Sequence, residues 1–256
     1  MDIKERVKLQ FGRNVANYVH SPLHEEGADL QPLADWVKSE QAKDALDLAT
    51  GGGHAALAVS PLVERLTAVD LTPEMLSTAE AFLRSKGHDR IRFVAGDAEK
   101  APFEPASFDL IVCRIAAHHF PNPDAFVSEA ARVLSAGGTF ILMDNIAPEA
   151  EEVDRLYNDV EKRRDPSHVR AWTKTEWIRR TEGAGLRLEQ LVQSRKTFVF
   201  ESWCRRMSVP EAEQRELEAY ILGRSAALKR AMGVTEAEGR MVSFEGDYMM
   251  LKARKS

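Results

Sequence analysis

The chain has 256 residues, 44% of them hydrophobic, and carries a formal net charge of −5 at pH 7, without a run of five or six basic residues. Its length suits one α/β domain with a sizeable core, and its charge argues against nucleic acid or an anionic membrane surface as a partner. The two cysteines form no disulfide or metal pattern, and the start MDIKERVK is too charged for a signal peptide. No apolar run approaches the ~18 residues that span a bilayer. We therefore expect a soluble, cytoplasmic protein with a small-molecule substrate, no membrane insertion and no metal.

The first 44 residues are predicted to be helical. Val7, Phe11, Val15 and Tyr18 recur at spacings that place them on one face of a helix. A second amphipathic helix is expected around residues 30–37, with a loop between the two helices. The apolar face of the first helix needs a partner surface, which is either the following sheet or a ligand site.

Residues 45–56, ALDLATGGGHAA, are predicted to form a buried strand, a glycine turn and the first turn of a helix. Asp47 interrupts the apolar strand where a central parallel strand reaches the open end of a sheet. Gly51 and Gly53 permit positive φ and let a ligand approach the backbone, and the helix from His54 directs its free N–H groups to the same place. A ligand site is therefore expected, although a tight turn without a ligand, or the G-x-G-x-x-A spacing of dinucleotide-binding sheets, fits the same residues.

Further apolar strands are expected over residues 65–70, 91–97, 108–114 and 139–144, with helices between them. The first two of these strands end in carboxylates, Asp70 and Asp97. Asp70 stands about where dinucleotide-binding folds place an acceptor for ribose hydroxyls. The alternation of strands and helices predicts parallel crossovers and a doubly wound sheet.

Four motifs in this order make the comparison with a known family specific. They are D-x-A-x-G-x-G at 47–53, VDL at 69–71, GDA at 96–98, and SFDLIVCR followed by AAHHF within 107–120. Together they resemble a class I S-adenosylmethionine-dependent methyltransferase of the methyltransferase type 11 group, related to the ubiquinone/menaquinone biosynthesis C-methyltransferases. The sequence departs from many members at Ala49, where they have the first glycine of the loop.

The resemblance implies a Rossmann-like class I methyltransferase fold, an α/β doubly wound, seven-stranded, mostly parallel sheet with one antiparallel strand and a helical cap. Residues 1–256 would form a single methyltransferase domain, with an N-terminal helical lid at 1–43, a cofactor-binding core at 44–146, and substrate-side insertions with the last strands at 147–256. Strands are expected at 191–200 and 247–254. The inserted helices would form either a cap over the substrate or the surface of a homodimer.

The resemblance also implies S-adenosyl-L-methionine as the cofactor. The glycine backbone would contact its methionine part, Asp47 would anchor the ammonium, and Asp70 would accept both ribose hydroxyls. Asp97 and the Ala98 backbone would hold the adenine ring, and Leu71 would pack on its face. The candidate cofactor residues are Asp47, Ala49, Gly51, Gly53, Asp70, Leu71, Asp97, Ala98 and Arg114.

His118 and His119 follow the fourth strand, where the methyl acceptor lies in related enzymes, and are the candidate catalytic residues. A histidine can remove a proton from an acidic carbon, oxygen or nitrogen, but adjacent side chains point in different directions, so at most one should face the acceptor. A structural hydrogen bond is the alternative for either. Arg114 could instead orient an acceptor through its guanidinium, or offer its backbone carbonyl to the cofactor. The candidate substrate contacts are Phe11, Tyr18, His168 and Arg170.

The expected activity is methyl transfer to a small molecule, with O-, N- and C-methylation all open. An NAD-dependent oxidoreductase shares the glycine turn, but the long segment before the first strand and the GDA motif disfavour it. A cofactor-binding protein that no longer transfers methyl groups remains open, because a fold does not determine a reaction.

Overall fold

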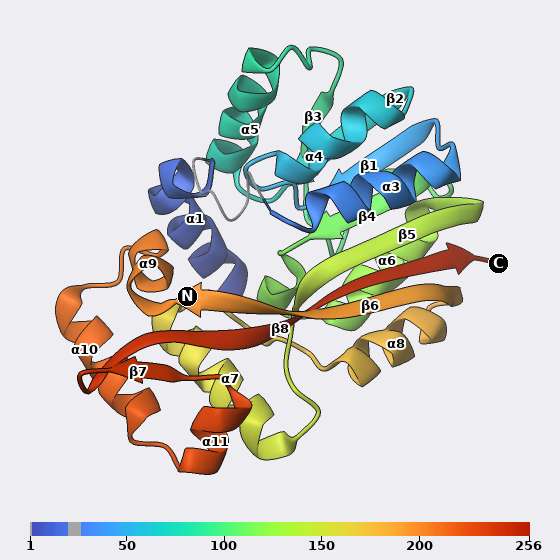
Figure 1. Ribbon diagram of the computed structural model, residues 1–256. Coiled ribbons are helices and arrows are strands. Elements are labelled where there is room, and N and C mark those ends of the chain that lie inside the picture. Colours follow the sequence, from blue (N-terminus) through green and yellow to red (C-terminus); the bar gives the residue numbers. More distant parts are fainter. Residues whose placement is uncertain (1, 20–26) are drawn as a thin grey trace.

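The computed structural model describes residues 2–19 and 27–256, with side chains described for residues 2–12 and 27–256. One mixed sheet runs through these residues in the strand order β3-β2-β1-β4-β5-β8-β6, with β7 paired to β8 (Figure 1). Its strands are β1 Asp44–Leu48, β2 Arg65–Asp70, β3 Arg92–Ala95, β4 Phe108–Arg114, β5 Leu134–Ile146, β6 Leu186–Val199, β7 Thr235–Ala237 and β8 Arg240–Lys255.

The strand directions confirm the predicted class I methyltransferase fold. Neighbouring strands from β3 to β5 are parallel, and β8 runs antiparallel to both β5 and β6. The short β7, also antiparallel to β8, adds an eighth strand that the sequence did not predict. Its residues are all exposed, so no burial pattern marks them.

Helices cover both faces of the sheet. Those in the described residues are α1 Ile3–Val19, α3 Leu30–Glu40, α4 His54–Val59, α5 Pro73–Ser85, α6 Pro123–Val133, α7 Glu151–Arg164, α8 Lys174–Gly183, α9 Phe200–Arg206, α10 Glu211–Leu222 and α11 Ala226–Ala231, with short 3-10 turns η1 Ser60–Leu62 and η2 Ala117–His119. None of the helices described is long and apolar enough to cross a membrane.

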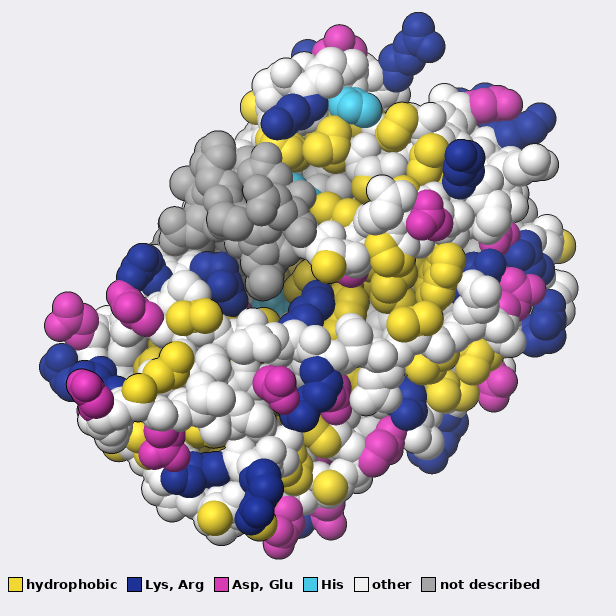
Figure 2. All heavy atoms as spheres, viewed as in Figure 1, with side chains coloured by type: hydrophobic (Ala, Val, Ile, Leu, Met, Phe, Trp, Pro, Cys, Tyr) yellow, Lys and Arg dark blue, Asp and Glu magenta, His cyan; other side chains and the backbone are white. Residues whose placement is uncertain are grey.

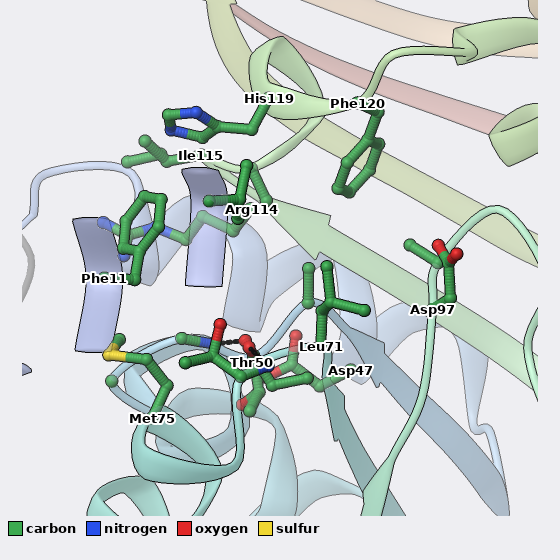
Figure 3. A pocket seen from close by; sticks show the side chains of 18 of the residues that line it. Phe11, Asp47, Thr50, Leu71, Met75, Asp97, Arg114, Ile115, His119 and Phe120 are labelled. Atoms are coloured by element: carbon green, nitrogen blue, oxygen red, sulfur yellow. Dashed lines mark hydrogen bonds between the residues drawn. The ribbon is translucent and has the colours of Figure 1, made fainter. Parts of the chain in front are cut away.

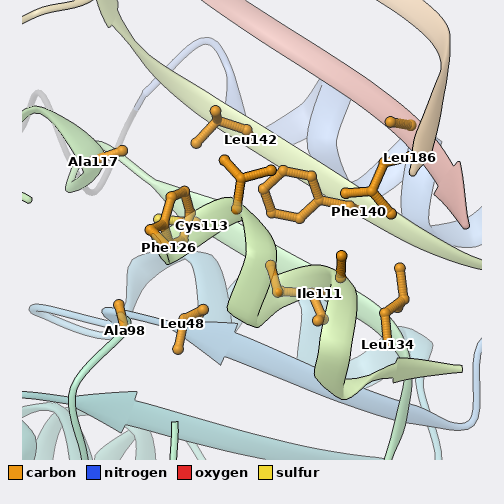
Figure 4. Close-up of a cluster of buried hydrophobic side chains, with 14 of the residues drawn as sticks. Leu48, Ala98, Ile111, Cys113, Ala117, Phe126, Leu134, Phe140, Leu142 and Leu186 are labelled. Atoms are coloured by element: carbon orange, nitrogen blue, oxygen red, sulfur yellow. The ribbon is translucent and has the colours of Figure 1, made fainter. Parts of the chain in front are cut away.

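Alternation along the central strands produces two cores. Leu46, Ile111 and Phe140 point to the face covered by α6 and α8, where Phe126 packs among them (Figure 4). Their immediate neighbours in sequence, such as Leu110 and Ile141, point to the opposite face and pack against α3 and α4. Each fully buried side chain of this size contributes about 1.5 to 3 kcal/mol to folding, so the two cores hold the strand ends in fixed register.

A third core lies beyond the edge of the parallel sheet. The pairing of β8 with β5 ends at Asp247, whereas its pairing with β6 continues to Ser243. The projecting pair of β6 and β8 packs with α7, α9 and α10 around Tyr157, Trp203 and Phe244. The two strands are longer than the predicted 191–200 and 247–254. Their pairing with each other extends them over residues that are mostly polar and carry no local strand pattern.

The N-terminal region divides into two parts with different surroundings. α3 buries Leu33 and Val37 against the sheet, whereas α1 contacts α5 and α9 at the carboxyl ends of the strands (Figure 1). Most of the predicted loop at residues 20–27 lies outside the described residues, as does the side chain of Tyr18.

Charges of both signs are interspersed on the face shown in Figure 2. Lysine and arginine side chains alternate there with aspartate and glutamate, and the residues described on that face form no continuous basic surface. A protein that binds a nucleic acid backbone usually presents such a surface.

Candidate active site

A pocket of about 970 Å³, including its open mouth, lies at the carboxyl ends of the parallel strands. Thr50, Asp47 and Leu71 lie on one wall, and Ile115, His119 and Phe120 lie on the opposite wall (Figure 3). The helix α1 adds Lys4, Val7 and Phe11. The predicted residues that line this pocket are Phe11, Asp47, Ala49, Gly51, Asp70, Leu71, Asp97, Ala98, Arg114 and His119.

The turn after β1 requires left-handed backbone at three positions. Ala49 has a φ of 66°, Gly51 of 54° and Gly53 of 85°. A residue with a Cβ in this conformation costs on the order of 1 kcal/mol, which explains why glycine is favoured where this chain has Ala49. Gly53 does not line the pocket, and a Cβ there would lie 3.0 Å from Leu83 Cδ1, so it allows α5 to pack closely.

Asp47 is a buried carboxylate with one unused oxygen. Its side chain is 1% exposed, and Oδ2 accepts a hydrogen bond from Thr50 Oγ1 at 2.6 Å. Among the residues that the structure describes, Oδ1 has no hydrogen-bond partner. Burial raises the pKa of Asp47 to about 6. A buried oxygen of this kind is costly unless a donor or a cation meets it, so it points to a positively charged ligand group in the pocket.

Asp70 closes the turn and still has acceptor capacity. Its Oδ2 accepts the backbone N–H of Gly51 and its Oδ1 that of Thr72, each at 2.9 Å. Burial raises the pKa of this carboxyl. Because each carboxylate oxygen can accept more than one hydrogen bond, Asp70 can hold the turn and accept two ligand hydroxyls at once.

Asp97 connects the pocket to α1. Its Oδ2 lies 2.6 Å from Lys4 Nζ, and its Oδ1 accepts the backbone N–H of Glu99 at 2.9 Å. Lys4 also lies 2.5 Å from the Glu99 carboxylate. Lys4 was not among the predicted residues, although its spacing from Val7 and Phe11 places it on the pocket-facing side of the helix. A lysine in an N-terminal helix is usually a surface residue, which is why it was missed.

The guanidinium of Arg114 is paired with a carboxylate of the protein. It forms a two-pronged pair with Asp29, with Nε 2.7 Å from Oδ2 and Nη2 2.9 Å from Oδ1. Both side chains are buried, and Tyr248 donates a further hydrogen bond to Asp29 at 2.5 Å. This geometry does not favour the interpretation in which the guanidinium orients an acceptor, and it leaves the backbone carbonyl as the candidate contact.

A second chamber of about 520 Å³ adjoins the pocket. The two share Phe11, Ile115 and His119 as a common wall. Ile115 has a φ of 54°, a strained conformation for a β-branched residue, of the kind that concentrates at functional sites. The other residues of the chamber are His118, Asn145, Glu161, Arg164, Phe198, Trp203, Arg206 and Met207.

The two candidate catalytic histidines have different environments. His118 Nδ1 lies 2.7 Å from Asp144 Oδ1, whereas His119 Nδ1 lies 3.1 Å from the Ser167 carbonyl oxygen. Burial lowers the pKa of His118, but the charge and hydrogen bond of Asp144, together with the charges of Glu161 and Asp165, outweigh burial and leave that pKa raised. Burial and the neighbouring His118 lower the pKa of His119 to about 4.

His168 and Arg170 line neither cavity. His168 Nε2 lies 3.0 Å from Asn158 Oδ1, and Arg170 pairs with Asp154 at 2.6 Å. Their loop turns inward, because the backbone N–H groups of Val169 and Arg170 donate to the His118 carbonyl. Both residues therefore support the loop behind the histidines, and the structure does not place them as substrate contacts.

Most of the second chamber's wall was missed by sequence reasoning. Glu161 and Arg164 come from α7, and Trp203 and Arg206 come from α9. No local motif indicates these residues, since α9 reaches the chamber only through the long pairing of β6 with β8. In the part of the chain that the structure describes, no three His, Cys, Asp or Glu side chains form a group able to hold a metal ion.

Comparison with known proteins identifies the family. A model described as a methyltransferase domain matches residues 46–142. Over 235 residues the chain is 34% identical to the uncharacterized methyltransferase YcgJ of Bacillus subtilis, covering 91% of this chain and 93% of the relative. The chain belongs to the class I methyltransferases of type 11. This confirms the resemblance drawn from the motifs and disfavours the NAD-dependent oxidoreductase.

Other relatives show how far the similarity extends. A Bacillus halodurans protein assigned as a methyltransferase has 45% identity and a TM-score of 0.87, covering 90% of this chain and 99% of its own. The ubiquinone/menaquinone biosynthesis C-methyltransferase UbiE of Rhizobium leguminosarum is 33% identical over 53% of this chain and 54% of its own length. The [4+2]-cyclase SpnF, at 19% identity and a TM-score of 0.58 over 88% of this chain and 80% of its own, shares the fold alone.

Proposed function

We propose that this methyltransferase uses S-adenosyl-L-methionine to methylate a small molecule. The observation that carries the proposal is the buried Oδ1 of Asp47, which no described residue meets with a hydrogen bond, in a pocket that also holds Asp70 and Asp97. When bound, S-adenosylmethionine supplies a methyl group on a sulfonium, an electrophilic carbon whose bond to sulfur breaks with its electrons kept by sulfur.

The residues of the pocket suit this cofactor at each of its parts. Asp47 would pair with the ammonium, Asp70 would accept the two ribose hydroxyls, and the apolar Leu71 would lie against the adenine ring. Asp97 and the Ala98 backbone would hold the adenine edge. The backbone of Gly51 and Gly52 lines the pocket near the expected methionine part.

The charge of the pocket argues against a nicotinamide cofactor. Asp47, Asp70 and Asp97 all line it, and together they favour the positive sulfonium and ammonium groups. The same carboxylates would repel the diphosphate of NAD. Lys4 offsets part of this charge at Asp97, but it lies at the outer end of the pocket with α1.

The second chamber is the proposed acceptor site. It adjoins the cofactor pocket through Phe11, Ile115 and His119, and it is enclosed by α7 and α9. Phe198, Trp203 and Met207 give it an apolar lining, as expected for a small-molecule site. An N-terminal lid formed by α1, a cytoplasmic location and a homodimer stay predictions.

Calorimetry with S-adenosylhomocysteine tests the cofactor assignment. We expect one site per chain with micromolar affinity, about −8 kcal/mol, and no heat with NAD. Asp70→Ala should weaken binding by roughly 1.5 to 3 kcal/mol, because the ribose hydroxyls lose a charged acceptor. Asp89→Ala, at an exposed position remote from the pocket, serves as the matched control. Binding of NAD in place of S-adenosylhomocysteine would refute the proposal.

A further inference from the structure

His118 and Asp144 form a buried pair beside the second chamber. Asp144 follows the central part of β5 and is fully buried. Its Oδ1 lies 2.7 Å from His118 Nδ1, and its Oδ2 accepts the backbone N–H of His118 at 3.0 Å. One carboxylate therefore holds both the ring and the backbone of this histidine, which fixes the orientation of the imidazole.

This pairing determines which ring nitrogen can act as a base. With Nδ1 against a carboxylate, the neutral ring keeps its proton on Nδ1 and its lone pair on Nε2. The His118 side chain is 11% exposed and lines the chamber. Within the described residues Nε2 has no hydrogen-bond partner, so it is the atom available to a molecule in the chamber.

The charged groups around His118 come from several elements. Asp144 on β5, Glu161 on α7 and Asp165 in the following loop raise its pKa, while burial lowers it. Two further imidazoles lie close, with ring centroids of His119 at 4.1 Å and His168 at 5.6 Å. The carboxylates outweigh these effects, so a proton taken up by His118 is stabilised.

His119 is poorly suited to the same role. Its Nδ1 faces the Ser167 carbonyl, and its Nε2 lies 3.9 Å from Asp165. Its ring meets Phe11 edge-on at 4.9 Å between centroids. With its proton affinity lowered by burial and by His118, it serves as part of the wall between the two cavities.

We propose that His118 is the general base for the acceptor, that Asp144 is its positioning residue, and that the acceptor is an aromatic molecule bearing an acidic hydroxyl. This rests on the proposed function. The acceptor O–H bond breaks, the proton passes to His118 Nε2, and both electrons stay on the oxygen, which becomes the nucleophile. The proton then leaves to water, and Asp144 keeps the imidazole in place throughout. Phe198 and Trp203 line the chamber beside Arg164 and Arg206, so its wall combines aromatic side chains that suit a ring with cations that suit an ionised hydroxyl.

Binding of 4-nitrophenol tests the acceptor class, because its phenolate absorbs visible light and its phenol does not. At a pH where the free probe is protonated, the wild-type protein is expected to bind it as the phenolate. His118→Asn and Asp144→Asn should both lose this band, and His88→Asn, outside both cavities, should keep it. No phenolate band with the wild type overturns the acceptor class, and a band lost in His119→Asn but kept in His118→Asn overturns the choice of base.

Histidine NMR tests the pair independently of any ligand. In ¹⁵N-labelled protein the neutral His118 should carry its proton on Nδ1, and Asp144→Asn should lower its proton affinity by about tenfold or more. An unchanged affinity overturns the pair. Calorimetry with S-adenosylhomocysteine on the same samples checks that each variant is folded. Failure of that ligand to bind the wild type would count against the proposed function, while the NMR result would still decide the His118–Asp144 pair.

Discussion

At the scale of single residues, we expect Asp47 to strengthen ligand binding and to lower the stability of the fold. Its folded pKa, about 6, lies above the ordinary value of 3.8, so the folded chain holds this proton more tightly than the unfolded chain does. Ionisation of Asp47 therefore lowers the free energy of unfolding. This cost is absent below the ordinary pKa and reaches roughly 3 kcal/mol once the pH exceeds the folded pKa. The stability contribution of Asp47 should rise as the pH falls from 7 toward 4.

Asp47→Asn should separate the two roles. At pH 7 the variant is expected to gain up to about 3 kcal/mol in free energy of unfolding, because a buried unpaired charge is removed. The gain should shrink toward pH 4, and S-adenosylhomocysteine should bind more weakly at every pH. Urea unfolding at several pH values measures this, with Asp89→Asn as the control. A variant less stable than the wild type at pH 7 would contradict the account.

Residues at strand ends could be predicted, and their partners could not. Asp47 lies near the end of the apolar β1 and Asp70 ends β2, a local pattern that places a carboxylate at the open edge of a sheet. The partners Asp29 of Arg114 and Asp144 of His118 lie far away in sequence, and each is one acid among many. Only the packing of α3 and β5 against β4 reveals them.

At the scale of elements, α1 is held over the pocket by few contacts. Lys4 joins it to Asp97 and Glu99, and Phe11 packs on His119. Among the side chains described in this helix, Leu9 is 43% exposed, and Val7 and Phe11 are only partly buried. A helix attached in this way opens at low cost, which suits a lid.

Lys4→Ala should loosen α1 without unfolding the core. A partly exposed ion pair contributes about 0.5 to 1 kcal/mol, so the amides of α1 should exchange hydrogen roughly two to five times faster. S-adenosylhomocysteine should also dissociate faster. Lys8→Ala removes an exposed side chain of the same helix that pairs with Glu5 at 3.5 Å, and it is the matched control. Equal exchange in both variants would mean that Lys4 does not anchor the helix.

The predictable elements are those with a strong local pattern. The parallel strands and the helices beginning at Pro73 and Pro123 could be predicted from apolar periodicity and an N-terminal proline. α11 and β7 could not, because they contain no residue that is buried. Their positions depend on the pairing of β6 with β8, two segments that are distant in the sequence.

At the scale of the whole molecule, one sheet positions the walls of both cavities. Its parallel half presents three carboxylates at the strand ends, and its antiparallel edge extends into the third core that carries α9. The fold could be predicted from the motifs, because their order is that of the strands. The acceptor chamber could not, since its walls come from α1, α7 and α9, which are brought together only in three dimensions.

The measurement that tests the central claim most directly is a crystal structure with S-adenosylhomocysteine. The account predicts the ligand in the pocket at the carboxyl ends of β1 and β2, with its ammonium at Asp47 Oδ1 and its ribose hydroxyls at Asp70. Its sulfur should face the wall that Ile115 and His119 share with the second chamber. A ligand bound in the second chamber, or one whose ammonium and ribose contact neither aspartate, would contradict the assignment of both cavities.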